Sequence, residues 1–310
     1  MSRKAIVTGG AGFIGSHLVD LLVDHGWDLL VVDDLSSGTM DNLGPARRRG
    51  KVGVHVMDVR APELPDVAVR YGPDVIFHLA AQSKVTVSMD DPMRDADINV
   101  LGTINVLLAA TRSGAGRVVF TSSAGIYGSR ARLPIKEKFV KRPDSPYGIS
   151  KKIVEDYFRW FHETHGLAYV MLAPANVYGP RQDPGLEGGV VAIFSRAMVE
   201  ERRPTVFGDG SQTRDFVYVA DVVDAFRHAA DLGDGLLLNI GSGMETTILE
   251  LYDTLAGITG YPTRPLFEAV KPGDIYRSVT DPSKAKTALG WEAWTSLEEG
   301  LRRTVKWYRE

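Results

Sequence analysis

The stretch that decides the fold is Lys4-Ala5-Ile6-Val7-Thr8-Gly9-Gly10-Ala11-Gly12-Phe13-Ile14-Gly15. A short apolar segment, which predicts a strand over residues 3–8, leads through a glycine cluster into a helical pattern that continues through Leu18, Leu21 and Leu22. Glycines at such a junction allow a tight turn, a close approach of backbone to phosphate, and close packing of helix on strand. The N-terminus of the helix presents free N–H groups to an anion. The stretch therefore predicts a binding site for the pyrophosphate of a dinucleotide.

An acidic residue follows at the distance that such a site requires. Asp33 comes 18 positions after Gly15, at the end of a second predicted strand over residues 28–33. Its carboxylate can accept hydrogen bonds from both adenosine ribose hydroxyls, whereas a 2′-phosphate there would meet a like charge. We therefore predict NAD rather than NADP as the cofactor. In the alternative interpretation, Asp33 and Asp34 only form a turn.

Short apolar runs alternate with helical patterns through the first two-thirds of the chain, which is typical of a parallel sheet built from strand–helix units. We expect strands at about 3–8, 28–33, 53–57, 74–79, 117–122 and 168–173, with a later strand at 236–240. After Asn176, glycines and prolines break the chain, and helical patterns return at 219–232, 248–258 and 296–308. The sequence thus predicts an α/β fold, a Rossmann-type doubly wound parallel sheet with a smaller C-terminal substrate-binding lobe. We expect an NAD-binding domain of residues 1–175 plus about 219–242, and a discontinuous substrate lobe of about 176–218 plus 243–310.

Composition limits the class of function. The 36 basic and 39 acidic residues give a formal net charge of −3, so the charge balance gives no reason to expect a nucleic-acid partner. The chain has no cysteine, which excludes disulfides, cysteine metal sites and thiol nucleophiles and suits a reducing cytoplasm. No apolar run is long enough to span a bilayer, so we expect a cytoplasmic protein with no membrane partner. His162 and His165 are the only close histidine pair, and without a carboxylate set they predict no metal site.

A tyrosine and a lysine four residues apart are the candidate catalytic groups. Tyr147 and Lys151 lie in a predicted helix that runs to about His165, so both project from one face. A phenol has a pKa near 10, and a neighbouring cation would bring its phenolate within reach near neutrality. Tyr147 is therefore a plausible general base, and Lys151 could also reach the nicotinamide ribose. The fifth predicted strand ends in Thr121-Ser122-Ser123, where a serine hydroxyl could share a hydrogen bond with the reacting oxygen.

With these motifs the sequence resembles the extended short-chain dehydrogenase/reductases and, within them, the UDP-glucose 4-epimerases. The resemblance covers essentially the whole chain. Its markers are the Thr8–Gly15 turn, Asp58-Val59, His78-Leu79-Ala80-Ala81-Gln82, Asn99-Val100-Leu101-Gly102-Thr103, Thr121-Ser122-Ser123, Tyr147 with Lys151, Asn176-Val177-Tyr178-Gly179-Pro180, and Gln212-Thr213-Arg214-Asp215-Phe216.

The resemblance implies roles for individual residues. The catalytic triad would be Ser123, Tyr147 and Lys151. The cofactor-binding residues would be Gly9, Gly12, Phe13, Ile14, Gly15, Asp33, Asp34, Leu35, Ser37, Gly38, Asp58, Val59, Leu79, Ala80, Ala81, Gln82, Asn99, Thr121, Tyr147, Lys151, Pro174 and Val177. The substrate-binding residues would be Ser83, Ser122, Ser123, Tyr147, Asn176, Gly189, Val190, Thr205, Val206, Phe207, Arg214, Lys271 and Asp274. Arg214 would supply charge-assisted bonds to phosphate; without the resemblance, an ion pair with Asp215 is the simpler interpretation.

The implied activity is NAD-dependent inversion of C4 of a UDP-hexose through a transient 4-keto sugar. A nucleotide-sugar 4,6-dehydratase or decarboxylase of the same fold is the first alternative. Such enzymes usually carry an acidic residue just after the Thr/Ser pair, and residues 121–127 contain none. A non-catalytic NAD-binding protein is the second alternative, although such proteins commonly lose the tyrosine or the lysine.

Departures from the family pattern leave the sugar open. Ala173-Pro174 stands where many relatives have Arg-Tyr, and Lys271 replaces a typical arginine, which keeps the charge but loses the bidentate geometry. Ser278 stands about where a bulky residue confines the sugar in some relatives. UDP-glucose and UDP-galactose are expected first, with UDP-N-acetylglucosamine and UDP-glucuronate as further candidates.

The oligomeric state can be argued from one helix. Apolar residues of the helix after Tyr147 spread over more than one stripe, so one face can cover the sheet while another remains to be buried. In the family this helix and the one near 90–113 pair across a two-fold axis, which implies a homodimer through helices near 90–113 and 147–165. The alternative is that the second lobe of the same chain buries the extra face.

Overall fold

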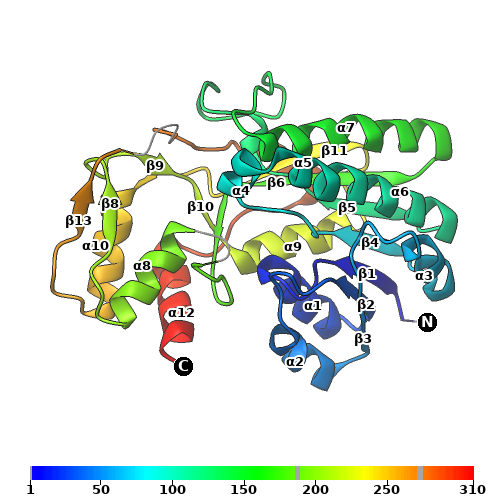
Figure 1. The fold of residues 1–310 in the computed structure, drawn as a ribbon, viewed down its shortest axis with the longest axis horizontal. Coiled ribbons are helices and arrows are strands. Elements are labelled where there is room, and N and C mark those ends of the chain that lie inside the picture. Colours follow the sequence, from blue (N-terminus) through cyan, green and yellow to red (C-terminus); the bar gives the residue numbers. More distant parts are fainter. Residues whose placement is uncertain (1, 186–188, 271–274) are drawn as a thin grey trace.

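The computed structural model describes residues 2–185, 189–270 and 275–310. In this part of the chain a parallel sheet of seven strands forms the centre of the larger lobe (Figure 1). Across the sheet the order is β3 (Val52–Val56), β2 (Asp28–Asp33), β1 (Lys4–Thr8), β4 (Val75–His78), β5 (Arg117–Thr121), β6 (Ala168–Pro174) and β11 (Leu236–Ile240). The order reverses between β1 and β4, and ligands bind at the carboxyl ends of strands beside such a switch point.

Helices cover both faces of this sheet. One face carries α1 (Phe13–Asp24), α2 (Met40–Arg49) and α9 (Val219–Ala229), and the other carries α3 (Leu64–Tyr71), α6 (Gly102–Ser113) and α7 (Pro146–His165). The amphipathic patterns explain this packing: α7, for example, buries Val154, Phe158 and Phe161, spaced four and three residues apart. The expected fold class, a doubly wound α/β sheet, is confirmed.

Three short elements lead from β4 to α6. They are α4 (Val85–Asp90), α5 (Pro92–Ala96) and η1 (Asp97–Leu101), a single turn of π-helix that continues into α6. All three contact α7. A π-helical turn inside a helix frequently marks a functional site.

In the described part of the smaller lobe, helices pack against short strands. Its helices are α8 (Val190–Val199), α10 (Ile248–Thr259) and α12 (Leu297–Arg309). Its paired strands are β8 (Thr205–Phe207) with β13 (Leu266–Glu268), and β9 (Thr213–Arg214) with β12 (Thr246–Thr247). A further pair, β7 (Asn176–Tyr178) with β10 (Phe216–Tyr218), lies where the chain passes between the lobes, and α11 (Ser283–Leu289) contacts β11.

The chain crosses between the lobes more than once. It leaves the sheet after β6, builds α8 and β8–β10, returns for α9 and β11, and then completes the smaller lobe (Figure 1). The returning segment is integral to the larger lobe, because α9 packs on α1 and β11 pairs in parallel with β6. Within the described ranges, no helix combines the length and apolar character needed to cross a membrane.

Candidate active site

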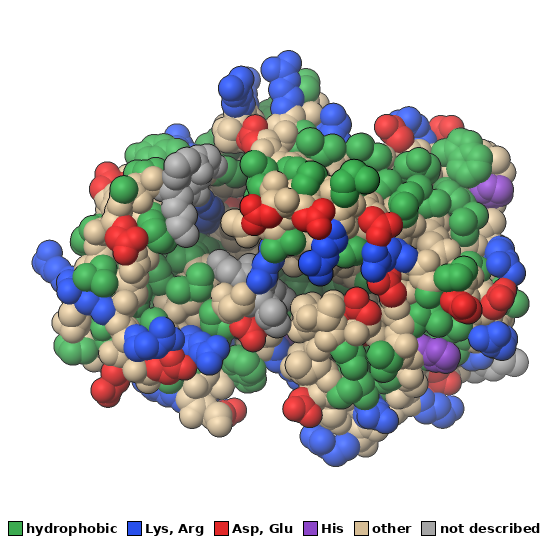
Figure 2. All heavy atoms as spheres, in the orientation of Figure 1, with side chains coloured by type: hydrophobic (Ala, Val, Ile, Leu, Met, Phe, Trp, Pro, Cys, Tyr) green, Lys and Arg blue, Asp and Glu red, His purple; other side chains and the backbone are tan. Residues whose placement is uncertain are grey.

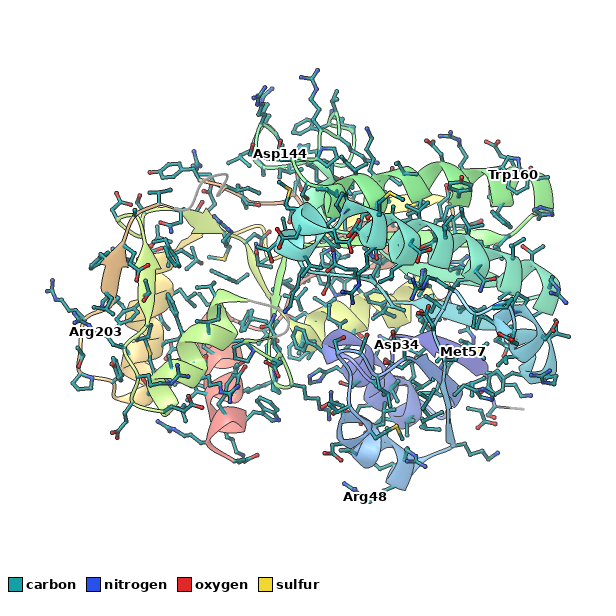
Figure 3. The ribbon with its side chains drawn as sticks, viewed as in Figure 1. Asp34, Arg48, Met57, Asp144, Trp160 and Arg203 are labelled. Carbon is teal, nitrogen blue, oxygen red and sulfur yellow. The ribbon has the colours of Figure 1, made fainter. Side chains whose placement is uncertain are left out.

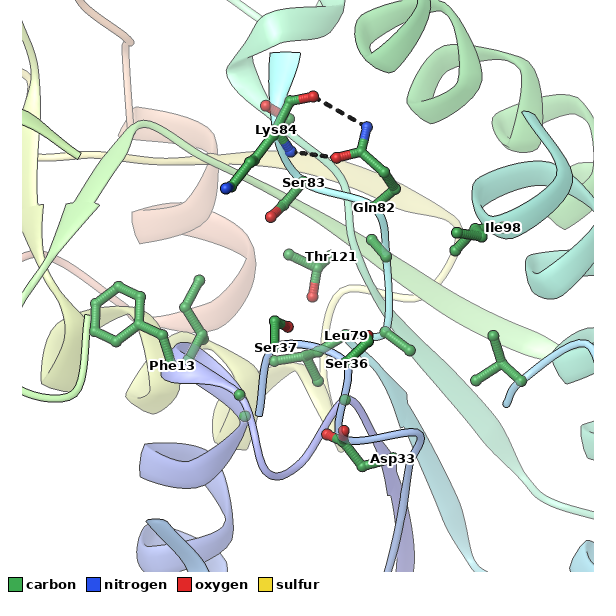
Figure 4. A pocket seen from close by; sticks show the side chains of 18 of the residues that line it. Phe13, Asp33, Ser36, Ser37, Leu79, Gln82, Ser83, Lys84, Ile98 and Thr121 are labelled. Atoms are coloured by element: carbon green, nitrogen blue, oxygen red, sulfur yellow. Dashed lines mark hydrogen bonds between the residues drawn. The ribbon is translucent and has the colours of Figure 1, made fainter. Parts of the chain in front are cut away.

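A cavity of about 470 Å³ opens at the carboxyl ends of the central strands (Figure 4). Most of the residues expected to bind the cofactor line it. These are Gly9, Gly12, Phe13, Ile14, Gly15, Asp33, Asp34, Ser37, Asp58, Val59, Leu79, Ala80, Ala81, Gln82, Thr121, Tyr147, Lys151, Pro174 and Val177, together with Ser83, Ser122 and Ser123 from the expected substrate and catalytic sets. The structure thus brings segments from seven parts of the sequence to one place.

The glycine-rich turn has no room for side chains at two positions. A Cβ on Gly9, whose φ is +69°, would lie 2.6 Å from the backbone nitrogen of Ala80. A Cβ on Gly15 would lie 2.0 Å from the backbone oxygen of Gly9. Helix α1 begins after Gly12, and among the described residues no side chain forms a capping hydrogen bond there. The turn is therefore tightly packed, and it lines the cavity at the N-terminus of a helix, which fits the pyrophosphate of a dinucleotide.

Asp33 ends β2 beside this cradle and is buried. Its Oδ2 accepts a hydrogen bond from the Ala11 nitrogen at 2.8 Å, and its Oδ1 accepts one from the Leu35 nitrogen at 2.9 Å. Burial raises the pKa of Asp33, while these two hydrogen bonds oppose the rise. The Asp34 carboxylate binds the backbone nitrogen of Ser36 at 3.0 Å, so both aspartates shape the turn. Because Asp33 also lines the cavity, the turn-forming and ribose-binding interpretations are compatible.

The helix that carries the tyrosine and lysine starts at a well-defined cap. The Ser145 side chain accepts a hydrogen bond from the Gly148 nitrogen, and Pro146 occupies the first turn. A Cβ on Gly148 would lie 2.7 Å from the backbone oxygen of Gly125, so α7 approaches η2 (Ala124–Ile126) closely. This approach places the Tyr147 ring and the Ser123 hydroxyl around Gly125, whose added Cβ would lie 3.8 Å from the ring and 3.3 Å from Ser123 Oγ.

The lysine is fixed to the end of β5 rather than to the phenol. Lys151 Nζ donates a hydrogen bond to the backbone oxygen of Thr121 at 2.9 Å and lies 4.7 Å from the centroid of the Phe120 ring. The centroid of the Tyr147 ring is 6.0 Å away. Burial lowers the pKa of Lys151 to about 7.

The expected effect of the lysine on the tyrosine is not what the structure shows. Burial raises the pKa of Tyr147, and the hydrogen bond with Ser123 only partly opposes the rise. The sequence argument considered the neighbouring cation alone. Burial removes water from both side chains and disfavours both charged forms. It therefore raises the pKa of the tyrosine and lowers that of the lysine, whereas attraction between the two charges would do the reverse.

Two hydroxyl groups in the cavity wall have no partner among the described residues. Thr121 Oγ1 and Ser122 Oγ are buried without a hydrogen bond in this part of the structure. Ser123 Oγ, in contrast, accepts a hydrogen bond from the Gly125 nitrogen at 3.0 Å. Buried polar groups are nearly always satisfied, so the two unpaired hydroxyls indicate where a polar ligand or water binds.

The cavity wall also contains residues that the sequence argument missed: Val32, Ser36, Met57, Lys84, Val87, Arg94, Ile98 and Ala175. Lys84 is positioned by Gln82, whose Oε1 accepts from the Lys84 nitrogen at 2.6 Å and whose Nε2 donates to the Lys84 oxygen at 3.0 Å (Figure 4). Met57 and Asp34 lie at neighbouring ends of β3 and β2 (Figure 3). Two of these residues could have been identified from the sequence. Met57 directly precedes Asp58, and Ser36 lies within the 33–38 loop.

Three of the expected cofactor residues lie outside this lining. Leu35 packs against the core with φ +59°, and a Cβ on Gly38 would lie 2.6 Å from the Ala11 carbonyl carbon. Asn99 is buried behind Gln82: its Oδ1 accepts from the Gln82 nitrogen and its Nδ2 donates to the Gln82 oxygen, each at 2.9 Å. The structure thus places these residues in support of the wall.

The expected substrate residues beyond β6 lie in or next to the smaller lobe. Asn176 begins β7, Gly189 precedes α8 and Val190 begins it, Thr205, Val206 and Phe207 form β8, and Arg214 lies in β9. None of these is in the described lining of the cavity. Lys271 and Asp274 lie outside the described residues. Asp215 is buried, and its carboxylate accepts hydrogen bonds from the hydroxyls of Ser242 and Thr280, each at 2.7 Å.

Comparison with known proteins agrees with this geometry. The family model described as GDP-mannose 4,6 dehydratase matches residues 6–304. The chain is 44% identical to the UDP-glucose 4-epimerase of Mycolicibacterium smegmatis over 99% of this chain and 98% of that protein. The structure of UDP-glucose 4-epimerase from Thermotoga maritima, solved with UDP-glucose, is 42% identical, covers 99% of both chains and superposes with a TM-score of 0.95.

A further similar structure contains the dinucleotide. The UDP-glucose 4-epimerase of Thermus thermophilus, in complex with NAD, is 36% identical over 99% of both chains, with a TM-score of 0.91. The family match and these full-length identities show that the chain belongs to the GDP-mannose 4,6 dehydratase family of extended short-chain dehydrogenases/reductases.

Proposed function

We propose that this protein is an NAD-dependent UDP-sugar 4-epimerase, with UDP-glucose and UDP-galactose as its first-choice substrates. One observation carries the proposal: Tyr147, Ser123 and Lys151 line the same cavity as the glycine-rich turn and Asp33. A hydroxyl pair there can exchange a proton with a sugar hydroxyl beside a dinucleotide. The full-length similarity to UDP-glucose 4-epimerases supports the same assignment.

The cavity fits NAD on the geometry of its own residues. Gly9 and Gly15 line the cavity, and each packs against neighbouring backbone too closely for a side chain, as a dinucleotide-binding turn requires. Asp33 presents a carboxylate for the adenosine ribose. Lys151 lines the same cavity and can donate a hydrogen bond to the second ribose. Bound NAD would supply reversible hydride transfer at C4 of the sugar, the oxidation and reduction that a 4-epimerase needs.

Tyr147 then acts as the proton acceptor and donor for the 4-hydroxyl. Ser123 shares a hydrogen bond with the same oxygen and keeps the phenol oriented, while its own Oγ is fixed by the Gly125 nitrogen. Burial raises the pKa of Tyr147, and a bound cationic nicotinamide ring would oppose this rise because a nearby positive charge favours the phenolate. Ser123, Tyr147 and Lys151 are thus the proposed catalytic residues.

A glycine beside the catalytic tyrosine distinguishes epimerisation from dehydration or decarboxylation. A Cβ on Gly125 would lie 3.3 Å from Ser123 Oγ and 3.8 Å from the Tyr147 ring, so a side chain at this position would face the reacting groups. An acidic side chain at position 125, within the window of residues 121–127, would therefore have a direct place in the site. Glycine leaves that place without a carboxylate, which favours simple oxidation and reduction at C4.

We assign the two lobes different roles. The sheet lobe, residues 1–175 plus about 219–242, would hold NAD, and the discontinuous smaller lobe would hold the UDP group. Asn176, Gly189, Val190, Thr205, Val206, Phe207 and Arg214 are the proposed uridine diphosphate ligands, with Arg214 supplying charge to phosphate. Inversion requires the sugar to turn over between the two hydride transfers, so the binding energy must reside mainly in the UDP group.

The sugar specificity is tested most directly by product analysis. Purified protein would be incubated without added NAD with UDP-glucose, UDP-N-acetylglucosamine or UDP-glucuronate, and proton NMR of the anomeric region would follow the products. We expect UDP-galactose from UDP-glucose, at unchanged mass. Conversion of UDP-glucuronate instead would show that the site accepts a carboxylate at C6. Loss of water or carbon dioxide by mass spectrometry would refute epimerisation.

We further propose that the protein is a homodimer through α5–α7. Ile153, Tyr157 and Trp160 are 44%, 38% and 51% exposed, so the second apolar stripe of α7 is not buried by the smaller lobe of its own chain. Trp160 projects outward from α7 (Figure 3), and apolar side chains gather over this part of the surface (Figure 2). Met93, Val100, Leu101 and Ile153 line a shallow hollow there. A second copy related by a two-fold axis would present the same apolar surface and bury this one.

A further inference from the structure

A buried carboxylate lies behind the cavity wall and is not used by the proposed chemistry. Asp95, in α5, is 1% exposed. Its Oδ1 accepts hydrogen bonds from Gln82 Nε2 at 2.8 Å and from Asn99 Nδ2 at 3.0 Å. Its Oδ2 is buried with no hydrogen-bond partner among the described residues. Burial of a carboxylate is costly, so its position calls for an explanation.

Of the two amides that Asp95 holds, Gln82 is part of the cavity wall and Asn99 lies directly behind it. Gln82 lines the cavity and fixes the backbone of Lys84 through two hydrogen bonds. Asn99 lies in the π-helical turn and exchanges two hydrogen bonds with the Gln82 backbone. The carboxylate therefore fixes the segment after β4 on one side and η1 on the other.

A third connection leads to the catalytic helix. Asn99 Nδ2 lies 3.2 Å from Ser150 Oγ, and that hydroxyl donates to the Tyr147 backbone oxygen at 2.9 Å. Ser150 lies between Tyr147 and Lys151 on α7, and α5 packs against this helix. The negative charge of Asp95 acts on both side chains and raises the pKa of each, against the lowering that burial imposes on Lys151.

Other ionisable groups around the pair do not duplicate this charge. His78, at the end of β4, is buried, and burial lowers its pKa to about 3, so it is neutral in the working range. Lys84 and Arg94 line the cavity and are cationic. On the neighbouring turn Asp97 is bound to Arg60, and on α7 Glu155 is bound to Lys141.

We propose that Asp95 is a positioning residue for the Tyr147–Lys151 pair: it anchors Gln82 and Asn99 and places a buried negative charge behind the two side chains. Two amide N–H groups donate to one oxygen of this carboxyl, which fixes its orientation behind the wall. The role of Asp95 in turnover rests on the proposed function. The effect of its charge on Tyr147 is a property of the folded chain with NAD bound, and it can be measured without turnover.

The test is Asp95→Asn, which keeps an oxygen in place for Gln82 and Asn99 but removes the charge. Because the carboxylate raises the pKa of both partners, its loss should lower both. We expect the midpoint for tyrosinate formation by Tyr147, in protein saturated with NAD, to fall by about one pH unit. The midpoint is measured from the ultraviolet absorbance of tyrosinate across a pH titration. For each protein, the titration of the same protein carrying Tyr147→Phe is subtracted, so that only Tyr147 contributes. The pH profile of kcat/KM should move in the same direction by a similar amount.

The matched control is Asp90→Asn, which removes an exposed carboxylate from the preceding helix and should leave both midpoints unchanged. Asp95→Ser provides a second neutral variant of smaller volume. Unshifted midpoints with reduced activity would show a merely structural residue and overturn the proposal. Failure of both neutral variants to fold, judged by circular dichroism, would also overturn it. A tyrosinate shift in a protein that lacks epimerase activity would instead refute the proposed function and leave this inference standing.

Discussion

Lys151 Nζ lies 2.9 Å from the backbone oxygen of Thr121 and donates a hydrogen bond to it, which ties the middle of the cavity wall to the end of β5. This bond satisfies one of the three donors of the ammonium group while the rest of the side chain is 3% exposed. The lysine is consequently held in an environment that favours its neutral form.

The first prediction concerns the stability of the free chain. The pKa of Lys151 is about 7 in the folded chain and near its ordinary value in the unfolded chain. Below pH 7 the folded chain must protonate a buried amine, which lowers the free energy of unfolding. This loss shrinks as the pH rises above 7. Lys151→Met removes this penalty. We expect its stability gain over wild type to be largest at pH 6 and to narrow by about 2–3 kcal/mol toward pH 9. Thermal unfolding at several pH values measures it, and a pH-independent gap would contradict the assignment. The exposed Lys152→Met is the control.

Removing the phenolic hydroxyl should abolish proton exchange without disturbing the cofactor. Tyr147→Phe keeps the ring but loses the acid–base group, and we expect turnover of the best UDP-sugar to fall by about 10²–10⁴-fold. NAD content after purification should match wild type. Tyr157→Phe, on the exposed stripe of the same helix, should retain full turnover. Unchanged turnover in Tyr147→Phe would revive the non-catalytic interpretation.

Two neighbouring glycines should respond differently to an added methyl group. Gly15→Ala would place Cβ 2.0 Å from the Gly9 oxygen, so the turn must move, and we expect a loss of about 3 kcal/mol in the free energy of unfolding. Gly12→Ala meets the same oxygen at 3.3 Å and should fold with near wild-type stability. Chemical denaturation compares the two. Equal stability of both variants would show that the turn is looser than described.

The choice of dinucleotide should depend on Asp33. Asp33→Asn removes the charge and one acceptor for the Ala11 nitrogen, so NAD affinity should fall about tenfold and the preference over NADP should narrow. Asp34→Asn removes the same charge from an exposed position and should have the smaller effect. Calorimetric titration with both cofactors decides between them. A larger effect at Asp34 would move the ribose site to that residue.

The oligomer can be tested at the centre of the proposed interface. Ile153→Arg puts a charge in the apolar hollow beside Met93 and Leu101. We expect light scattering to give twice the 33.9 kDa chain mass for wild type and a single chain mass for the variant. Phe267→Arg changes an exposed apolar residue of β13, in the smaller lobe away from this surface (Figure 1), and should stay dimeric. A monomeric wild type would remove the proposal.

The sequence was sufficient for the sheet because each buried strand is a short apolar run with a helical pattern after it. Strand β2 matches its expected bounds of 28–33, and β11 matches 236–240. The small strand pairs β7–β10 and β9–β12 were not predicted, since elements of two or three residues that pair across long stretches of chain have no periodic pattern. The placement of Leu266–Glu268 beside β8 is of the same kind.

The cavity wall was predictable where a motif has a fixed backbone geometry, as at Gly9 and Asp33. Asp95 was not, because Met93-Arg94-Asp95-Ala96-Asp97 reads as a solvated segment and only packing under α7 shows that one of its carboxylates is buried. The direction of the Tyr147 pKa shift was also missed. It depends on how much water the fold excludes, and spacing along a helix contains no such information.

The return of the chain to its first lobe affects the order in which the protein can be completed during synthesis. Residues 1–175 emerge from the ribosome with α1 still lacking its neighbour α9 and with the edge of β6 unpaired. Both gaps close only after residue 240 has emerged, once a large part of the second lobe has been translated. A nascent chain halted before that point would display an open strand edge and an uncovered apolar helix, which are features that chaperones bind.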